Sequence, residues 1–339
     1  MGLFSLTQEL AIDLGTANTI IICNDKVMVD EPSVIAVNVR TGQLEAIGKK
    51  AKPYIGACPP HLKTIRPLKD GVIADFEATE WMLRGMISKI KPRGSLFAPS
   101  LKMVVCIPSG STNVEIRAVH DSAEHAGARE VAMIFEPMAA ALGAGLDIEA
   151  PEGNLIIDIG GGTSEFACIS LGGIVCSESV SVAGDVFTED IVRYLRTQLN
   201  LKVGERTAED IKCKIGAALP KLDEEPEPYI LTGPNTLTAL PQTVSLTYTE
   251  IYKALDPSLK KLDEALMHVL EKMPPELYAD IVRTGIHIAG GGALIKGLDK
   301  RFTNKTGIQC HIADDPLRAI VRGTNMALKN FDHYSFLLR

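Results

Sequence analysis

One strand–turn–strand pattern occurs twice in this sequence, and no other feature restricts the fold as much. Residues 10–23 read LAIDLGTANTIIIC, and residues 155–169 read LIIDIGGGTSEFACI. In each copy an apolar strand runs into Asp and Gly, small residues follow, and a second apolar strand begins at Thr or Ser. Each copy is therefore predicted to form a β-hairpin with a tip of small residues.

A second repeated pattern lies downstream of each hairpin. Residues 135–140 read FEPMAA, and residues 314–319 read DDPLRA. In both, an acid precedes a proline at a predicted helix start, where a missing N–H costs nothing and a negative charge suits the helix dipole. Two halves that each carry a hairpin and a linking helix predict a pseudo-twofold molecule with a cleft between the halves.

The rest of the sequence alternates predicted strands with predicted helices, which is typical of an α/β fold. Strands are predicted at residues 101–108 and 286–289, and helices at residues 113–126, 188–199, 207–216 and 258–273. The segment 220–241 is rich in Pro, acids and Thr, with two short strand-like pieces. It is predicted to form a small peripheral subdomain.

Length and charge narrow the class of protein. A chain of 339 residues is too long for one ordinary core and suits two domains. The net charge of -7 argues against wholesale nucleic-acid binding. The seven cysteines show no CxxC spacing, so reduced thiols are expected. No signal peptide and no apolar run of membrane-spanning length is recognised, so we expect a soluble protein or one bound to a membrane from one side.

The two hairpin tips are candidate phosphate loops, because small residues let backbone N–H groups approach a phosphate closely. A single such loop is more simply a tight turn, but two symmetric loops, each preceded by Asp, indicate a polyphosphate held from both sides. The candidate residues are Gly15, Thr16, Ala17, Asn18 and Thr19 in the first loop and Gly160, Gly161, Gly162 and Thr163 in the second. Asp13 and Asp158 would face Mg²⁺ through water. Neither loop matches a Walker A or a GxGxxG motif.

Five segments together resemble one family. The segments DLGTANT, DIGGGTSE, EPMAAALGAG, IAGGGALIKGL and ADDPLRAIVRGT occur in family order between residues 11 and 328, and they resemble the MreB family of bacterial actins. The resemblance implies an actin-like (ribonuclease H-like) two-domain fold with the nucleotide in the interdomain cleft. Domain I would comprise residues 1–143 and 318–339, with a peripheral subdomain at about 32–70. Domain II would comprise residues 144–317, with a peripheral subdomain at about 180–242.

The resemblance also implies a role for particular residues around ATP and Mg²⁺. Gly290, Gly291, Gly292 and Ala293 would pass under the adenosine, and Glu209 and Lys212 would flank the nucleoside. Glu136 would position or activate the attacking water, assisted by Thr163; without the resemblance, Glu136 is more simply an acid at a helix N-terminus. Two positions depart from the family. Phe135 stands where many members have Glu, which leaves the hydrolysis rate open, and Ser164 replaces a Thr.

A basic, apolar loop interrupts the acidic chain. Residues 81–114 contain no Asp or Glu and include five cations, and Leu96 and Phe97 stand in a turn between Gly94 and Pro99. Together with the match to the family's membrane loop, this predicts that Leu96 and Phe97 enter a lipid interface while the cations face anionic lipid. The alternative is that the pair folds back over a core. Residues 3–6 are either a second membrane contact or a lead-in to the first strand.

The resemblance implies an ATP-hydrolysing protein that polymerises into antiparallel protofilament pairs on the inner face of the cytoplasmic membrane. Such filaments would determine cell shape by organising peptidoglycan synthesis and elongation, with RodZ-like and MreC-like partners and no nucleic acid. A cytoplasmic, peripheral location follows. The alternatives are a nucleotide-switched chaperone, a small-molecule kinase of the same superfold and a plasmid-segregating actin, although the apolar loop argues against the last.

Overall fold

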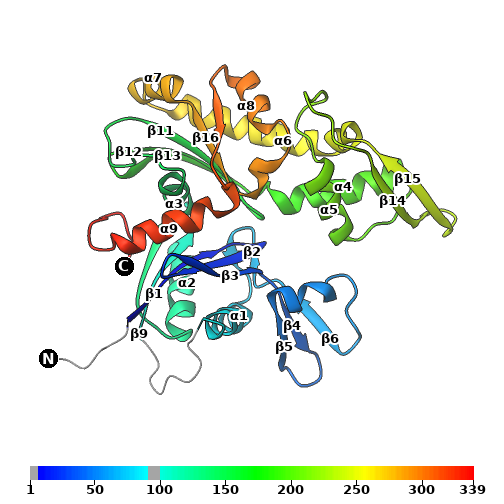
Figure 1. Cartoon of the computed structure of the whole chain (residues 1–339), viewed down its shortest axis with the longest axis horizontal. Helices are drawn as coiled ribbons and strands as arrows, with labels where there is room; N and C mark the ends of the chain where they lie inside the picture. Colours follow the sequence, from blue (N-terminus) through cyan, green and yellow to red (C-terminus); the bar gives the residue numbers. More distant parts are fainter. Residues whose placement is uncertain (1–6, 91–99) are drawn as a thin grey trace.

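Each repeated hairpin lies at the centre of a five-stranded sheet in the computed structural model, which describes residues 7–90 and 100–339. The first sheet has the order β10-β9-β1-β2-β3, and the second has the order β13-β12-β11-β16-β17 (Figure 1). The first sheet consists of β1 (Thr7–Leu14), β2 (Asn18–Cys23), β3 (Lys26–Pro32), β9 (Ser100–Ile107) and β10 (Ala128–Phe135). The second consists of β11 (Asn154–Ile159), β12 (Ser164–Ser170), β13 (Gly173–Val180), β16 (Ile286–Ala289) and β17 (Cys310–Ile312).

The two sheets have the same topology. In each, the hairpin pairs antiparallel with a third strand on one side and parallel with a later strand on the other. This confirms the predicted hairpins and the duplicated α/β architecture. We call the first sheet with its helices the first half, and the second sheet with its helices the second half.

The strands β1 and β11 are buried on both faces, which explains their continuous apolar sequence. Helices α1 (Phe76–Ser88) and α2 (Asn113–His125) cover the outer face of the first sheet. The outer face of the second sheet packs against an apolar core shared with five helices. These are α4 (Gly184–Gln198), α5 (Glu205–Ile215), α6 (Tyr248–Lys272), α7 (Pro275–Thr284) and α8 (Leu298–Thr306).

Two helices lie between the sheets and join the halves. Helices α3 (Glu136–Gly143) and α9 (Ala319–Lys329) share one apolar core with the inner faces of both sheets (Figure 1). They cross with backbone against backbone, because a methyl group added at Gly143 would overlap the carbonyl of Ala319, and one added at Gly323 would overlap the carbonyl of Ala139. The first acid–proline pair, Glu136 and Pro137, begins α3 itself, and the second leads into α9 through the short 3₁₀ turn η4 (Pro316–Arg318).

Small peripheral units extend from each half. The first half carries the sheet β4 (Ile35–Asn38), β5 (Leu44–Ile47) and β6 (Leu62–Ile65), the turns η1 (Gly48–Lys50) and η2 (Lys52–Tyr54), and the hairpin β7 (Leu68–Lys69) and β8 (Val72–Ile73). The second half carries the hairpin β14 (Tyr229–Pro234) and β15 (Pro241–Leu246). The turn η3 (Gly291–Leu294) is not part of a peripheral unit, because it follows β16 of the second sheet. The exact limits of the two domains stay a prediction.

The predicted elements match the structure closely, with one correction. The helix predicted at residues 258–273 begins ten residues earlier, at Tyr248, and contains Pro257 in its interior. A proline normally ends a helix, but here a capping box at Thr247 and Glu250 starts the helix, and the buried Ile251, Leu255 and Leu259 pack its face on both sides of the proline. All seven cysteines are free thiols. Within the described residues, no helix has the length and apolarity to cross a membrane.

Candidate functional site

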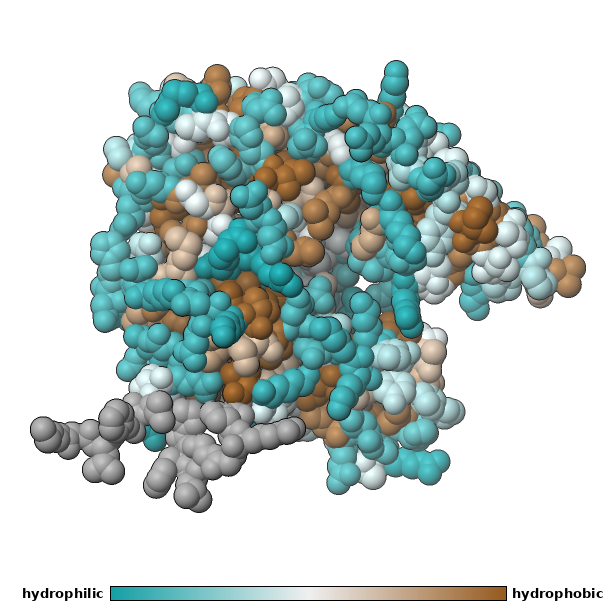
Figure 2. Space-filling view, in the orientation of Figure 1, coloured by the Kyte–Doolittle hydropathy of each residue, from teal (hydrophilic) through white to brown (hydrophobic). Residues whose placement is uncertain are grey.

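A deep cleft separates the two halves on the side where both hairpin tips lie. The cavity has a volume of about 1340 Å³, and Figure 2 shows the surface hollowed between the upper and lower parts of the molecule. The predicted residues that line it are Asp13, Gly15, Thr16, Ala17, Asn18, Glu136, Asp158, Gly160, Gly161, Gly162, Thr163, Glu209, Lys212, Gly290, Gly291 and Gly292. The structure therefore brings together residues that are dispersed over most of the sequence.

The first loop is the tip of the β1–β2 hairpin. The Gly15 N–H donates to the Asn18 carbonyl at 3.1 Å, and a methyl group at Gly15 would lie 2.7 Å from that oxygen, so the turn requires glycine. Thr19 does not line the cavity. It is fully buried, and its hydroxyl lies 2.9 Å from that of Ser33, which in turn donates to the Gly15 carbonyl at 2.6 Å. Thr19 thus supports the loop from behind.

The second loop repeats this geometry and meets the first. The Gly160 N–H donates to the Thr163 carbonyl at 2.9 Å. A methyl group at Gly161 would lie 2.6 Å from the Ala17 Cβ, and one at Gly162 would lie 2.7 Å from the Thr16 hydroxyl oxygen. Larger residues at these two positions would therefore push the hairpin tips apart.

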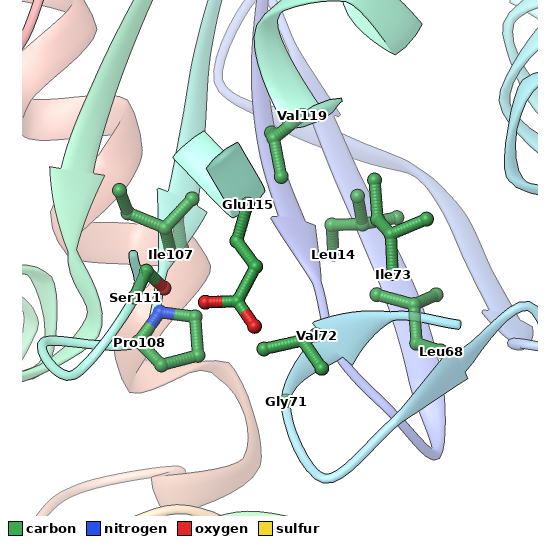
Figure 3. A pocket seen from close by; sticks show the side chains of 11 residues that line it. Leu14, Leu68, Gly71, Val72, Ile73, Ile107, Pro108, Ser111, Glu115 and Val119 are labelled. Atoms are coloured by element: carbon green, nitrogen blue, oxygen red, sulfur yellow. The ribbon is translucent and has the colours of Figure 1, made fainter. Parts of the chain in front are cut away.

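A third turn, which the sequence analysis did not single out, reaches the same place. Asp70 and Gly71 form the β7–β8 turn with φ values of 50° and 79°, and the Gly71 N–H donates to the Thr16 hydroxyl at 2.9 Å. An Asp-Gly pair between short apolar strands is the signal that predicts such a turn. Behind it lies a cavity of only about 10 Å³, into which the Glu115 side chain points (Figure 3). That space holds at most one water, so it belongs to the packing.

Three acids converge in the cleft. Burial raises the pKa of Asp13 to about 7. Burial, followed by repulsion from Glu165 and Asp13, raises the pKa of Asp158 well above its ordinary value. Burial also raises the pKa of Glu136 strongly, and the charges that add to the effect all belong to acids, Glu165 first. No positive charge in the described part of the chain contributes to these three shifts, so the acids favour a cation or a proton between them.

Glu165 is a buried acid at this site that the sequence analysis did not identify. It lies on β12 opposite Asp158 and is fully buried. Both carboxylate oxygens accept from the Ser109 N–H at 3.0 Å, which ties β12 of the second half to the loop after β9 of the first. Burial raises its pKa, and the hydrogen bonds from Ser109 and Ser179 oppose that rise. The sequence signal that could have identified Glu165 is the presence of an acid in a mainly apolar strand.

The titration of Asp13 leads to a prediction about stability and pH. Folding raises its pKa from the ordinary 3.8 to about 7, so the folded state holds the proton more tightly. This contribution to stability is fully present below about pH 4 and is lost as the pH rises toward 7. The loss amounts to about 4 kcal/mol of the free energy of unfolding. In EDTA without nucleotide, the melting temperature should fall between about pH 5 and 7, and less steeply for Asp13→Asn.

Asp332→Asn is the matched control, because its side chain is 91% exposed and should leave the slope unchanged. The other buried acids titrate in the same direction, so Asp13→Asn should reduce the slope without abolishing it. Equal slopes for the wild type and Asp13→Asn would contradict the prediction.

The far side of the cleft is built by α5 and the Gly290 turn. Lys212 Nζ donates to the Gly184 carbonyl at 2.7 Å and lies 2.6 Å from Glu209. Burial alone would raise the pKa of Glu209, but the Lys212 charge and hydrogen bonds lower it. Gly290 has a φ of 80°, and a methyl group there would lie 2.5 Å from Asp158 Oδ1. Ala293 is fully buried and does not line the cavity.

Some residues of interest fall elsewhere. Leu96 and Phe97, and the residues 3–6, lie outside the described residues, so their predicted membrane contact stays a prediction. Phe135, at the family's usual Glu position, is the N-cap residue of α3 and packs against the apolar cores on both sides of the first sheet. Several basic residues line the cleft and were not singled out from the sequence: Lys49, Lys52, Arg66, Arg206 and Arg318.

Known proteins resemble this chain over nearly its whole length. The family model described as MreB/Mbl protein matches residues 7–335. The cell shape-determining protein MreB of Escherichia coli K12 is 44% identical over 98% of this chain and 95% of its own length. The corresponding values for Mbl of Bacillus subtilis 168 are 41%, 96% and 97%. The crystal structure of MreB5 of Spiroplasma citri bound to AMPPNP superposes with a TM-score of 0.90 at 37% identity, covering 96% of this chain and 97% of that one.

Proposed function

Because this chain belongs to the MreB/Mbl family and has an actin-like fold, we propose that it binds and hydrolyses ATP and polymerises into membrane-associated filaments. The family consists of cell shape-determining, actin-like proteins. The observation that carries the proposal is the pair of glycine loops that meet at the cleft beside three buried acids. Fold alone would not distinguish the functions of this superfamily, but these groups fit a polyphosphate.

The cleft suits a nucleoside triphosphate. Its two loops would present backbone N–H groups to the phosphates, and the Gly290 turn and α5, which also line the cleft, would form a wall for the nucleoside. Structures of the Spiroplasma citri relative contain AMPPNP and ADP, which supports the same ligand class here. We therefore assign Glu209, Lys212 and residues 290–292 to the nucleoside, and the two hairpin tips to the phosphates.

The buried acids fit a divalent cation. Asp158 Oδ1 is one of two buried side-chain polar atoms in the described residues that lack a hydrogen-bond partner, and carboxylate oxygens are the ligands that Mg²⁺ prefers. Asp13 and Asp158 would hold Mg²⁺ through water. When bound, the ion would supply positive charge to the phosphates and to the acids.

Glu136 is the proposed base. It sits at the first turn of α3, is only 7% exposed, and faces the cavity that Thr163 also lines. Water would attack the terminal phosphate, its proton would pass to the Glu136 carboxylate, and the bond to the leaving ADP oxygen would break. The raised pKa of Glu136 makes its ionised form a stronger base.

Filaments and the membrane complete the proposal. Self-association into antiparallel protofilament pairs, contact of Leu96 and Phe97 with the inner membrane surface, and RodZ-like and MreC-like partners are proposed from the family. Burial of one Leu and one Phe per subunit gives weak binding, and many subunits in one filament would give avidity. The proposed role is the organisation of peptidoglycan synthesis during elongation from the cytoplasmic side.

Electron microscopy of the purified protein with Mg-ATP, with and without anionic liposomes, tests this function. We expect paired filaments that lie along the lipid surface, and loss of lipid binding but not of filaments in Leu96→Ser/Phe97→Ser. Filaments that do not bind the liposomes would favour a plasmid-segregating type of actin. Protein that binds ATP and never polymerises would favour a chaperone-like or kinase-like function instead.

A further inference from the structure

One arginine makes ion pairs from the first half to the second across the cleft. Arg66 follows β6 in the peripheral unit of the first half and lines the cavity. Its Nη1 lies 3.4 Å from Asp185 Oδ2, and its Nη2 pairs with Glu205 Oε1. In Figure 1 the unit of β4, β5 and β6 faces α4 and α5 across the opening between the halves. Arg66 therefore bridges the cleft.

Both acidic partners are attached to the elements that form the candidate nucleotide site. The backbone N–H of Asp185 donates to the Gly161 carbonyl of the second phosphate loop at 2.8 Å. Glu205 is the first residue of α5, the helix that carries Glu209 and Lys212. A single side chain thus holds the phosphate loop and the nucleoside helix of one half against the other half.

We propose that Arg66 is a positioning residue that keeps the cleft closed over bound nucleotide and thereby slows nucleotide release. The inference rests on the proposed nucleotide site. Release requires the halves to separate at this opening, and separation breaks both ion pairs. The transition state for release therefore lacks an interaction that the bound state has, and removing the Arg66 charge lowers the barrier.

The expected size of the effect follows from exposure. The Arg66, Asp185 and Glu205 side chains are 38%, 34% and 46% exposed, so solvent screens each pair and each contributes modestly. Two such pairs together correspond to a change in release rate of about two- to thirtyfold. Since salt screens exposed pairs, release from the wild type should also accelerate with ionic strength.

The experiment measures how fast ADP labelled with a fluorophore on its ribose is displaced by excess unlabelled ATP, at a protein concentration at which the chain is monomeric. Arg66→Gln should release the label about two- to thirtyfold faster than the wild type, with a much weaker dependence on salt. Arg66→Lys should be intermediate, because it keeps the charge and loses the two-pronged geometry. Arg40→Gln is the matched control, since Arg40 is exposed and its side chain makes no ion pair within the described residues.

A mutant cycle shows whether Arg66 acts through the two acids. Asp185→Asn/Glu205→Gln should accelerate release as much as Arg66→Gln does, and adding Arg66→Gln to it should change nothing further. Release from Arg66→Gln at the wild-type rate, or additive effects in the cycle, would overturn the proposal. A wild-type protein that binds no labelled ADP would instead overturn the proposed function, and this inference with it.

Discussion

Replacing Glu136 with Gln is expected to lower the rate of ATP hydrolysis by about 100- to 10,000-fold, the usual cost of losing a positioned general base. Glutamine keeps the size of the side chain and removes its ability to accept the proton of the attacking water. Glu136 is almost completely buried at the cleft, so bulk solvent offers no ready substitute. Phosphate release at saturating Mg-ATP measures the effect.

Nucleotide binding should survive the Glu136→Gln change, because the loops that would hold the phosphates are untouched. The substitution adds no negative charge beside the phosphates, so binding should not weaken. Glu130→Gln is the matched control: Glu130 lies on the same strand that leads to Glu136, and its side chain is 64% exposed. Phosphate release by Glu136→Gln at the wild-type rate would show that another group takes the proton.

Replacing Gly323 with Ala is expected to destabilise the protein by about 3 kcal/mol or more and to lower its melting temperature by roughly 4 °C or more. The added methyl group would overlap the carbonyl of Ala139 on α3 and would also lie 2.8 Å from the Gly143 N atom. These are backbone atoms, so no side chain can rotate out of the way. Thermal unfolding followed by circular dichroism measures the change.

The control for this substitution is Gly173→Ala. Gly173 begins β13, and an added methyl group would meet only the Ser170 carbonyl oxygen, at 3.9 Å. That change should alter the stability by less than about 0.5 kcal/mol. If Gly323→Ala has the same melting temperature as Gly173→Ala, then α3 and α9 can separate at low cost. In that case the backbone contact between them does not hold the halves together.

The parts of the fold and site that could be predicted depend on local patterns. The two hairpins were predictable because the two strands, the turn and the acid of each hairpin all lie within 15 consecutive residues. Their shared position in two equivalent sheets followed from the repetition alone. The roles of Glu209 and Lys212 come only from family resemblance, since nothing local marks them, and these roles stay a prediction; the structure shows that both residues line the cleft.

Features that depend on distant contacts were not predictable. Arg66 lies in an ordinary stretch of sequence, and its partners are 119 and 139 residues away. Glu165 matters because the chain brings Ser109 to it, which no spacing reveals. The early start of α6 was missed because Pro257 is a local signal against a helix, and tertiary packing on both sides of it outweighs that signal.

The crossing of α3 and α9 has a mechanical consequence. At Gly143 and Gly323 the two helices meet backbone against backbone, and neither glycine puts a side chain between them, so this point is suited to act as a fulcrum. The halves of the molecule are then levers, and a rotation that hardly disturbs the fulcrum is magnified at the open end. Ion pairs that lie far from this fulcrum resist the rotation through a long lever arm. Even weak ion pairs at that distance can therefore limit how often the cleft opens.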